Sequence, residues 1–309
     1  GDLVVAGSKC NSKIINFMAK HGRGLICLAL TKKQIDKLKL PLMSQINKSR
    51  MQTAFTVSIE AKKGITTGIS AFDRAKTIKV AINPKSKKKD IVSPGHVFPL
   101  VSRNGGVLER AGHTEASVDI SKLSKLNPSS VICEVMNEDG RMARLIDLVK
   151  FSKKHKIKIA SIADLIAHRL KNEKLVYKSF SKKVNYKRFK LFLSIYKNKL
   201  NNFESFVFSK GKFKINKPIP IRVLSKKINK RNLFENKEIK KNLNFITKYK
   251  NFMLVVINNE MKSKKSDTDI TLRYYGIGAQ IIKDFDVRNM ILLSRSKKKI
   301  IGLEGFGLK

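Results

Sequence analysis

The stretch VICEVM at residues 131–136 is an apolar run interrupted by one carboxylate, Glu134. A second run, LICLAL at residues 25–30, carries no charge. Short apolar runs of this kind are typical of strands buried on both faces, and segments with helical spacing lie at residues 11–20 and 162–171. Strands and helices alternate without a strict β-α-β period. We therefore predict an α+β fold, with a mixed sheet surrounded by helices.

Other expected elements of the N-terminal half follow from local signals. Thr31 and Ser70 stand directly before helix-patterned segments, and hydroxyl side chains are favoured N-caps. Residues 80–94 are basic and polar, which predicts a loop. We further expect strands at residues 55–59, 97–100 and 157–161 and helices at residues 32–38, 113–126 and 144–153.

The patterning changes near residue 172, where a Lys- and Asn-rich stretch begins. We predict a first domain over residues 1–172 and a second, smaller α/β domain over residues 178–309. The clearest patterning in the second half lies at residues 252–257, 275–282 and 290–293.

The chain is strongly basic, with 66 Lys and Arg against 23 Asp and Glu, a formal net charge of +43. Abundant Lys, Ile and Asn together are typical of A/T-rich coding, and the excess charge is spread over both halves. The basic runs are short and are not interleaved with aromatic residues. We expect any nucleic-acid binding to be non-specific and sensitive to salt.

Cysteine usage and hydropathy indicate the cellular environment in which we expect the protein. The three cysteines, Cys10, Cys27 and Cys133, neither form a disulfide framework nor have the spacing of a zinc site. No apolar run approaches the ~20 residues of a membrane span, and the N-terminus has no signal-peptide pattern. We expect a protein of the reducing cytoplasm that is not embedded in a membrane.

The densest polar cluster is RAGHTE at residues 110–115, which opens a predicted helix. Free N–H groups at a helix start suit a phosphate, Arg110 supplies a guanidinium and Thr114 a hydroxyl. His113 has a ring nitrogen that suits a metal. The alternative is that His113 and Thr114 only cap the helix.

Two further residues are candidates for proton transfer. Glu134 lies in an otherwise apolar strand, where an unpaired carboxylate is unfavourable unless a partner or a metal offsets it. His96 precedes a predicted strand, and a lone histidine there is often simply a satisfied core residue. Asp73 and Arg74 suit a surface ion pair, and Cys27 and Cys133 suit small buried residues.

Many stretches of residues 1–170 resemble, in order, one family of lyases, 3,4-dihydroxy-2-butanone 4-phosphate synthase. They are GDLV at 1–4, HGRGLIC at 21–27, FTV at 55–57, TTGISAFDR at 66–74, PGHVFPL at 94–100, RAGHTEA at 110–116, CE at 133–134 and NEDGRMAR at 137–144.

The resemblance implies a homodimer with an α+β fold that uses Mg²⁺ or Mn²⁺. It implies conversion of D-ribulose 5-phosphate to formate and L-3,4-dihydroxy-2-butanone 4-phosphate, a step of riboflavin synthesis. His113 is similar to the metal ligand, and His96 and Glu134 to the two catalytic residues. The implied substrate contacts are Asp2, Arg110, Ala111, Gly112, His113, Thr114 and Glu134.

The sequence departs from the family at its start. An acidic loop with an Arg-Glu pair should precede the matching Gly1-Asp2 and supply a second metal ligand, and this chain begins at Gly1. We expect either a fragment or a crippled enzyme, and the absence of an initial Met favours a fragment.

The second half resembles a GTP cyclohydrolase II domain, through IRVLS at 221–225, RYYGIGAQI at 273–281 and IGLEGFGL at 301–308. That family needs three zinc-ligating cysteines, and residues 171–309 contain none. Thr271 stands where an acidic proton acceptor is expected, and the glycine-rich phosphate segment is missing near Asn258 to Glu260. We expect no zinc and no activity on GTP.

Three hypotheses follow from the sequence. The first is the lyase with a degenerate second domain. The second is a catalytically inactive scaffold or regulatory remnant of a bifunctional riboflavin protein. The third is a basic nucleic-acid-binding protein.

Overall fold

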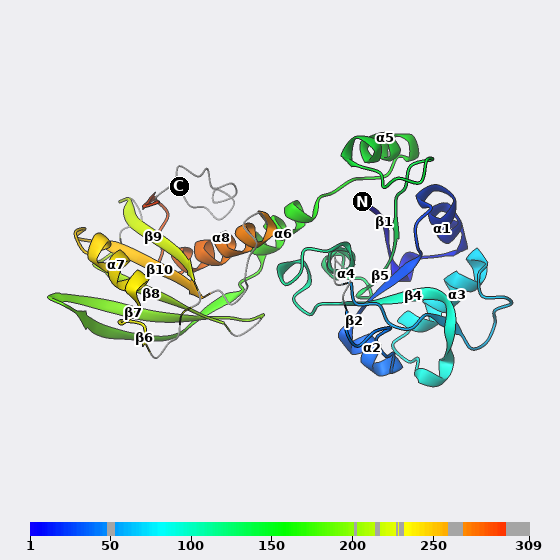
Figure 1. The fold of residues 1–309 in the computed structure, drawn as a ribbon, viewed down its shortest axis with the longest axis horizontal. Helices are drawn as coiled ribbons and strands as arrows, with labels where there is room; N and C mark the ends of the chain where they lie inside the picture. Colours follow the sequence, from blue (N-terminus) through cyan, green and yellow to red (C-terminus); the bar gives the residue numbers. More distant parts are fainter. Residues whose placement is uncertain are drawn as a thin grey trace. The chain divides into compact units, whose positions relative to one another are not determined.

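The chain divides into two compact units, Gly1–Leu165 and Ile166–Lys309, and the division falls within helix α6 (Ile162–Asn172) (Figure 1). The structure is a computed structural model. It describes residues 1–47, 53–200, 203–213, 217–226, 228, 232–258 and 268–294, with the backbone alone for 268–275. Within these residues, every helix is shorter or more polar than one that crosses a bilayer.

The first unit is built on a mixed sheet, as predicted. Its described strands lie in the order β1-β5-β2-β4-β3, with β2 and β4 parallel and the other neighbours antiparallel. The strands are β1 (Asp2–Ala6), β2 (Cys27–Thr31), β3 (Ile59–Ala61), β4 (Ile91–Ser102) and β5 (Ser129–Glu134).

Helices cover both faces of this sheet. On one face, Ile15 of α1 (Ser12–Phe17) and Ile78 of α3 (Ala71–Ile82) join the apolar core around Val131. Successive strand residues point to opposite faces, so Ser130 faces the other way. There the Ser121 and Ser130 hydroxyls lie 2.8 Å apart, which brings α4 (His113–Leu123) close to β5.

Capping explains where several helices begin. The Thr31 hydroxyl accepts a hydrogen bond from Gln34 N at the start of α2 (Lys32–Leu38), and the Ser70 hydroxyl accepts one from Asp73 N at the start of α3. Both predicted caps are confirmed. The other helical segments of this unit are η1 (Gly7–Lys9), η2 (Met18–Gly22), η3 (Lys88–Asp90), η4 (Gly106–Leu108) and α5 (Leu145–His155).

The predicted strand at residues 55–59 is wrong, because its residues pair with different segments. Thr56 N donates to Pro99 O at 3.0 Å, whereas Val57 N donates to Pro41 O at 3.1 Å. No continuous ladder forms, and only Ile59 belongs to a strand, β3.

Two other sequence expectations are corrected. Residues 157–161 form no strand, because Ile157 N donates to Ser152 O and closes the end of α5, and Ile159 stays exposed. Residues 80–94 are not simply a loop, since α3 extends to Ile82 and β4 begins at Ile91, which pairs with Ala61 of β3. Both errors arise because tertiary pairing decides strand formation.

The second unit is also a sheet covered by helices. Its described strands lie in the order β11-β9-β10-β8-β7-β6, with β9 parallel to β10 and β11 and the remaining neighbours antiparallel. They are β6 (Val176–Tyr186), β7 (Phe189–Asn198), β8 (Glu204–Lys210), β9 (Ile219–Lys226), β10 (Phe252–Asn258) and β11 (Met290–Leu292).

Strand β10 is almost wholly apolar because both of its faces are covered. Leu254 lies in a core with Leu243 of α7 (Lys237–Ile246), whereas Val255 lies in a core with Ile281 of α8 (Thr268–Lys283). Continuous apolar strands are expected where both faces of a sheet are covered. The patterning at residues 252–257 is thereby explained.

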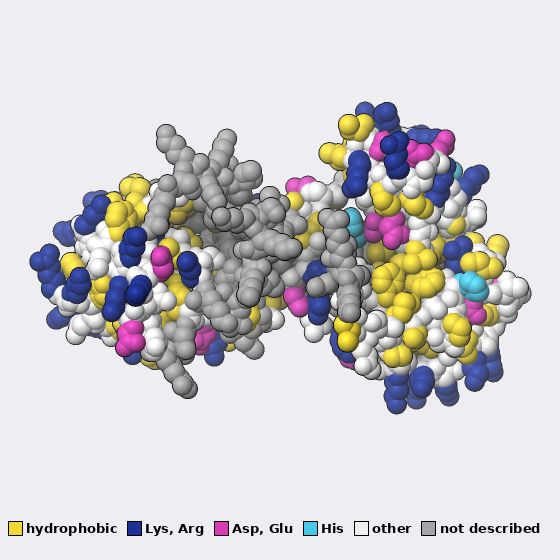
Figure 2. Space-filling view, in the orientation of Figure 1, with side chains coloured by type: hydrophobic (Ala, Val, Ile, Leu, Met, Phe, Trp, Pro, Cys, Tyr) yellow, Lys and Arg dark blue, Asp and Glu magenta, His cyan; other side chains and the backbone are white. Residues whose placement is uncertain are grey.

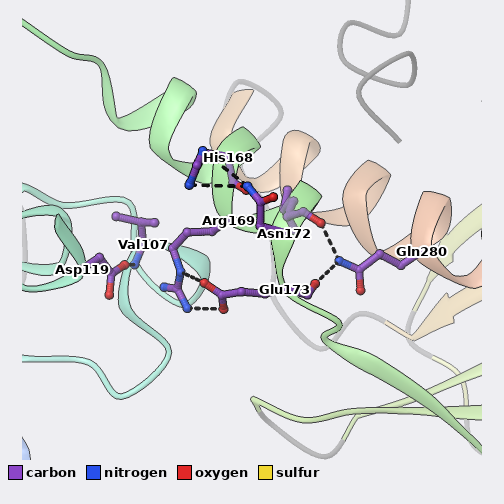
Figure 3. A network of polar contacts seen from close by, with 8 residues as sticks. Val107, Asp119, His168, Arg169, Asn172, Glu173 and Gln280 are labelled. Carbon is purple, nitrogen blue, oxygen red and sulfur yellow. Dashed lines mark hydrogen bonds and ion pairs between the residues drawn. The ribbon is translucent and has the colours of Figure 1, made fainter. Parts of the chain in front are cut away.

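Gln280 ties α8 to the end of α6 (Figure 3). Its amide nitrogen donates to Leu170 O and Glu173 O, both at 2.7 Å, and its amide oxygen accepts from Leu175 N at 2.9 Å. A Cβ at Gly276 would lie 2.5 Å from Leu170 Cδ1, so glycine permits the close approach. The described end of the stretch RYYGIGAQI is therefore a packing element.

Candidate active site

Two carboxylates of the predicted site meet at one edge of the first sheet. Asp2 of β1 pairs directly with Glu134 of β5, so their side chains share a face. Leu25 N donates to Glu134 Oε2 at 2.9 Å. A Cβ at Gly24 would lie 2.5 Å from Glu134 O and 2.7 Å from its Oε2, so only glycine lets the chain pass this closely.

His113 joins these carboxylates from helix α4. Its Nδ1 lies 3.8 Å from Asp2 Oδ1, and its side chain is half exposed. His113 is the first residue of α4, and the N-cap, Gly112, offers no side-chain cap. His113 and Thr114 are therefore not cap residues, and the helix start faces this edge with its N–H groups uncapped by a side chain.

His96 lies on the same sheet edge by strand register. Cys27 of β2 pairs with both Ile132 of β5 and Phe98 of β4. His96 stands two residues before Phe98 and Glu134 two residues after Ile132, which places the two at the same level along the strands. The break in the β3–β4 register just before Val97 means that the strand alternation does not set the face on which the His96 side chain lies. The side chain of His96 is 44% exposed, so it is not a core residue.

Burial raises the pKa of Asp2 above its ordinary value of 3.8. The nearby imidazole of His113 opposes this shift, and the carboxylate of Glu134 adds to it. Two carboxyl groups in a partly buried place repel each other when ionised, and a cation relieves that repulsion.

The side chains of Asp2, Glu134 and His113 suit a divalent cation whose remaining ligands are water or substrate oxygens. Carboxylate oxygens suit Mg²⁺ and Mn²⁺, and an imidazole nitrogen is a further ligand. The described residues hold no group of three His, Cys, Asp or Glu side chains arranged to bind a metal by themselves. Mg²⁺ usually retains water and substrate oxygens as ligands, so an incomplete protein set is compatible with it.

The segment Arg110–Thr114 is held by the buried Glu115. Arg110 Nη1 lies 2.5 Å from Glu115 Oε2, and Arg103 N donates to Glu115 Oε1 at 3.1 Å. A Cβ at Gly112 would lie 2.2 Å from Arg110 Nη1, so the backbone closes over the guanidinium. Thr114 is buried, whereas Ala111 and Gly112 are partly exposed. The sequence pointed to Arg110 and gave no sign of its partner Glu115.

Asp73 does not form the expected surface ion pair with Arg74. Its carboxylate is buried and accepts hydrogen bonds from Thr66 N at 3.2 Å, Thr66 Oγ1 at 2.8 Å and Gly68 N at 3.1 Å. The bond from the Thr66 hydroxyl is the largest cause of a lowered pKa at Asp73. Asp73 thus fixes the Gly68 loop.

Cys27 and Cys133 are buried, as expected for small apolar residues, whereas Cys10 is partly exposed. Cys27 and Cys133 are 2% and 0% exposed. Burial raises the pKa of the Cys133 thiol to about 11 and also raises the pKa of Cys27, and neighbouring carboxylates add to both shifts. Both groups are neutral thiols at pH 7, which makes them poor nucleophiles.

The Asp2 carboxylate should destabilise the metal-free protein at neutral pH. Its pKa is raised on folding, so the free energy of unfolding falls as pH rises through 3.8 towards the folded pKa. Asp2→Asn should raise the Tm at pH 7 in a chelator by about 2–4 °C, corresponding to roughly 1 kcal/mol. Below pH 3 the gain should vanish. The exposed Asp36→Asn serves as the control, and equal Tm values for Asp2→Asn and wild type at pH 7 would contradict this account.

Comparison with known proteins identifies the family of the first unit. A family model described as 3,4-dihydroxy-2-butanone 4-phosphate synthase matches residues 1–168. The chain belongs to the 3,4-dihydroxy-2-butanone 4-phosphate synthase family. A relative of that name from Photobacterium phosphoreum is 38% identical, and the match covers the whole chain and 90% of the relative.

A two-domain synthase of known structure shares the architecture of the whole chain. The crystal structure of RibBX, a two domain 3,4-dihydroxy-2-butanone 4-phosphate synthase from A. baumannii, is 37% identical with a TM-score of 0.85, covering all of this chain and 90% of that one. A structure of the synthase in complex with two magnesium ions matches 55% of this chain and 85% of its own, at 37% identity and a TM-score of 0.53.

The second unit has its own relatives. A family model described as GTP cyclohydrolase II matches residues 240–309. The riboflavin biosynthesis protein RibBA of Aquifex aeolicus is 44% identical over the whole chain and 84% of its own length. The stretch IGLEGFGL at 301–308, the residues Asn259 and Glu260 and the side chain of Thr271 lie outside the described part of the structure.

Proposed function

We propose that the first unit converts D-ribulose 5-phosphate to L-3,4-dihydroxy-2-butanone 4-phosphate and formate in riboflavin biosynthesis. The observation that carries this proposal is the meeting of Asp2, Glu134 and His113 at one end of the sheet, with His96 at the same level along the strands. The reaction needs no added water or oxidant, because the four-carbon phosphate and formate together contain every atom of the five-carbon substrate.

The proposed roles follow from the chemistry of each side chain. Arg110 and the N–H groups that open α4 bind the phosphate. Asp2 and Thr114 contact the substrate, and Asp2 accepts hydrogen bonds from its hydroxyls. Glu134 and His96 move protons at adjacent carbons, which allows an enediol to form and the skeleton to rearrange.

A divalent ion is part of the proposal. His113 would hold Mg²⁺ or Mn²⁺ beside the carboxylates, and the ion would polarise the ketose oxygens and stabilise enediolate charge. We propose that the protein is a homodimer of the cytoplasm, that it needs no zinc, and that it binds nucleic acid only non-specifically.

Formate release tests the proposal. Purified protein with ribulose 5-phosphate and Mg²⁺ should release formate, detected with formate dehydrogenase, and chelation should stop the release. Since the family has an acidic loop before Asp2, the test includes a variant with that loop added. A folded protein that releases no formate in either form would reject the lyase and favour an inactive scaffold or regulatory remnant.

We expect the second unit to leave GTP unchanged. The cyclohydrolase reaction needs a hydroxide activated by zinc on thiolates, and residues 171–309 contain no cysteine. Incubation of the protein with GTP and Zn²⁺, followed by chromatography, should show GTP alone. Formate or a pyrimidine product above the level of a boiled control would overturn this expectation.

A further inference from the structure

We propose that Glu60 is a positioning residue for His96, which it orients so that Nε2 is the nitrogen that takes the substrate proton. This inference rests on the proposed function, because His96 acts there in proton transfer. Glu60 Oε1 lies within hydrogen-bonding distance of His96 Nδ1. Nothing in the local sequence pattern singles out Glu60.

An irregularity between β3 and β4 creates the pair. Ile59 pairs with Val97, but the next residue, Glu60, pairs with Val92, so residues 93–96 bulge out of β4. A bulge of this kind re-aims side chains, and here it brings His96 to the Glu60 carboxylate. A Cβ at Gly95 would lie 2.2 Å from the Ile59 carbonyl carbon, so only glycine permits this closeness.

The backbone at Gly68 also approaches the Glu60 carboxylate closely. Its side chain is 16% exposed, much less than that of His96. Gly68 has a φ of +86°, and a Cβ there would lie 1.7 Å from Glu60 Oε1. Asp73 fixes this loop through its bonds with Thr66 and Gly68. Glu60 is therefore enclosed by backbone, unlike the carboxylate of a mobile surface ion pair.

The chemistry follows from the two nitrogens of a neutral imidazole. A carboxylate that accepts from Nδ1–H leaves the lone pair on Nε2. When Nε2 removes a proton from a substrate carbon, that C–H electron pair stays on the substrate. The imidazole becomes an imidazolium that the nearby Glu60 carboxylate stabilises without taking the proton itself.

Two substitutions test the inference, with Glu60→Gln chosen to preserve shape. Glu60→Gln and Glu60→Ala should lower kcat by roughly 10–100-fold with little change in KM, as expected for loss of a partner that orients a functional histidine. Glu60→Asp should retain more activity than Glu60→Ala. Glu235→Gln, an exposed residue of the second unit, is the matched control and should keep the wild-type rate.

A double-mutant cycle separates positioning from general structure. In a His96→Ala background, Glu60→Gln should have almost no further effect on kcat, because the residue it orients is gone. An equal loss in both backgrounds, or a wild-type kcat for Glu60→Gln, would overturn the inference.

Nuclear magnetic resonance keeps this test independent of the reaction. In the wild type, the ¹⁵N shifts of His96 should show the proton of the neutral ring on Nδ1, and Glu60→Ala should change that distribution. Suppose that the protein makes no formate, but that Nδ1 of His96 carries the proton and loses it in Glu60→Ala. The lyase proposal then fails, and the claim that Glu60 orients His96 is retained. A ring protonated on Nε2 in the wild type would refute the positioning.

Discussion

Glu134→Gln should reduce formate production to a small fraction of the wild-type rate while the protein remains folded. The amide has the shape of the carboxylate and retains an oxygen for the bond from Leu25 N, so the sheet edge should survive. It can no longer accept a proton. General acid–base catalysis contributes about 10²–10⁴-fold, and we expect kcat to fall by that range.

The measurement for Glu134→Gln is the initial rate of formate release, with Tm as the check on folding. Glu138→Gln is the matched control, because Glu138 lies four residues further on and its side chain is 91% exposed. Wild-type turnover by Glu134→Gln would show that the catalytic carboxylate lies elsewhere.

His113→Ala should remove both metal affinity and turnover. His113 is the imidazole beside Asp2 Oδ1, and its loss would remove the imidazole nitrogen from beside the two paired carboxylates. Electrostatic stabilisation by a divalent ion contributes several kcal/mol in the transition state, so turnover should fall by about 10²-fold or more. Mn²⁺ binding measured by electron paramagnetic resonance should weaken in parallel.

His168→Ala is the control for this second prediction, because His168 is an exposed residue of α6 that contacts Asn172 (Figure 3). It should bind Mn²⁺ and release formate as the wild type does. Unchanged Mn²⁺ affinity in His113→Ala would contradict the assignment of His113 as a ligand.

In the first unit, the sequence predicted best those strands whose residues are apolar because both faces are buried. Residues 25–30 and 131–136 are apolar because helices cover both faces, so β2 and β5 were recognisable. Residues 55–59 and 157–161 also have strand-like patterns, yet the hydrogen bonds of their backbone groups do not form a continuous strand ladder. Local pattern does not contain that information, because pairing depends on distant segments.

The sequence indicated the candidate catalytic and binding residues, but it did not indicate the residues that hold them in place. Glu134 stood out as a carboxylate in a core strand, and the family resemblance pointed to Asp2, His96 and His113. Glu60 and Glu115 lie in unremarkable positions of the sequence, and only the folded backbone shows that each contacts a neighbouring side chain of the proposed site.

The surface view shows why charge was a poor guide to function. Lys and Arg side chains are scattered over much of the visible face, whereas acidic and histidine side chains are few (Figure 2). On this face, the basic side chains are therefore not gathered at one place. Salt-sensitive, non-specific contacts with nucleic acid are what such a distribution predicts.

The most direct measurement is NMR of uniformly ¹³C-labelled ribulose 5-phosphate incubated with the protein and Mg²⁺. The account predicts that labelled formate and a four-carbon phosphate appear in a one-to-one ratio, and that Glu134→Gln produces only a small fraction of both. An unchanged substrate, or a substrate that only isomerises without losing a carbon, would contradict the claim that this sheet edge is a lyase site.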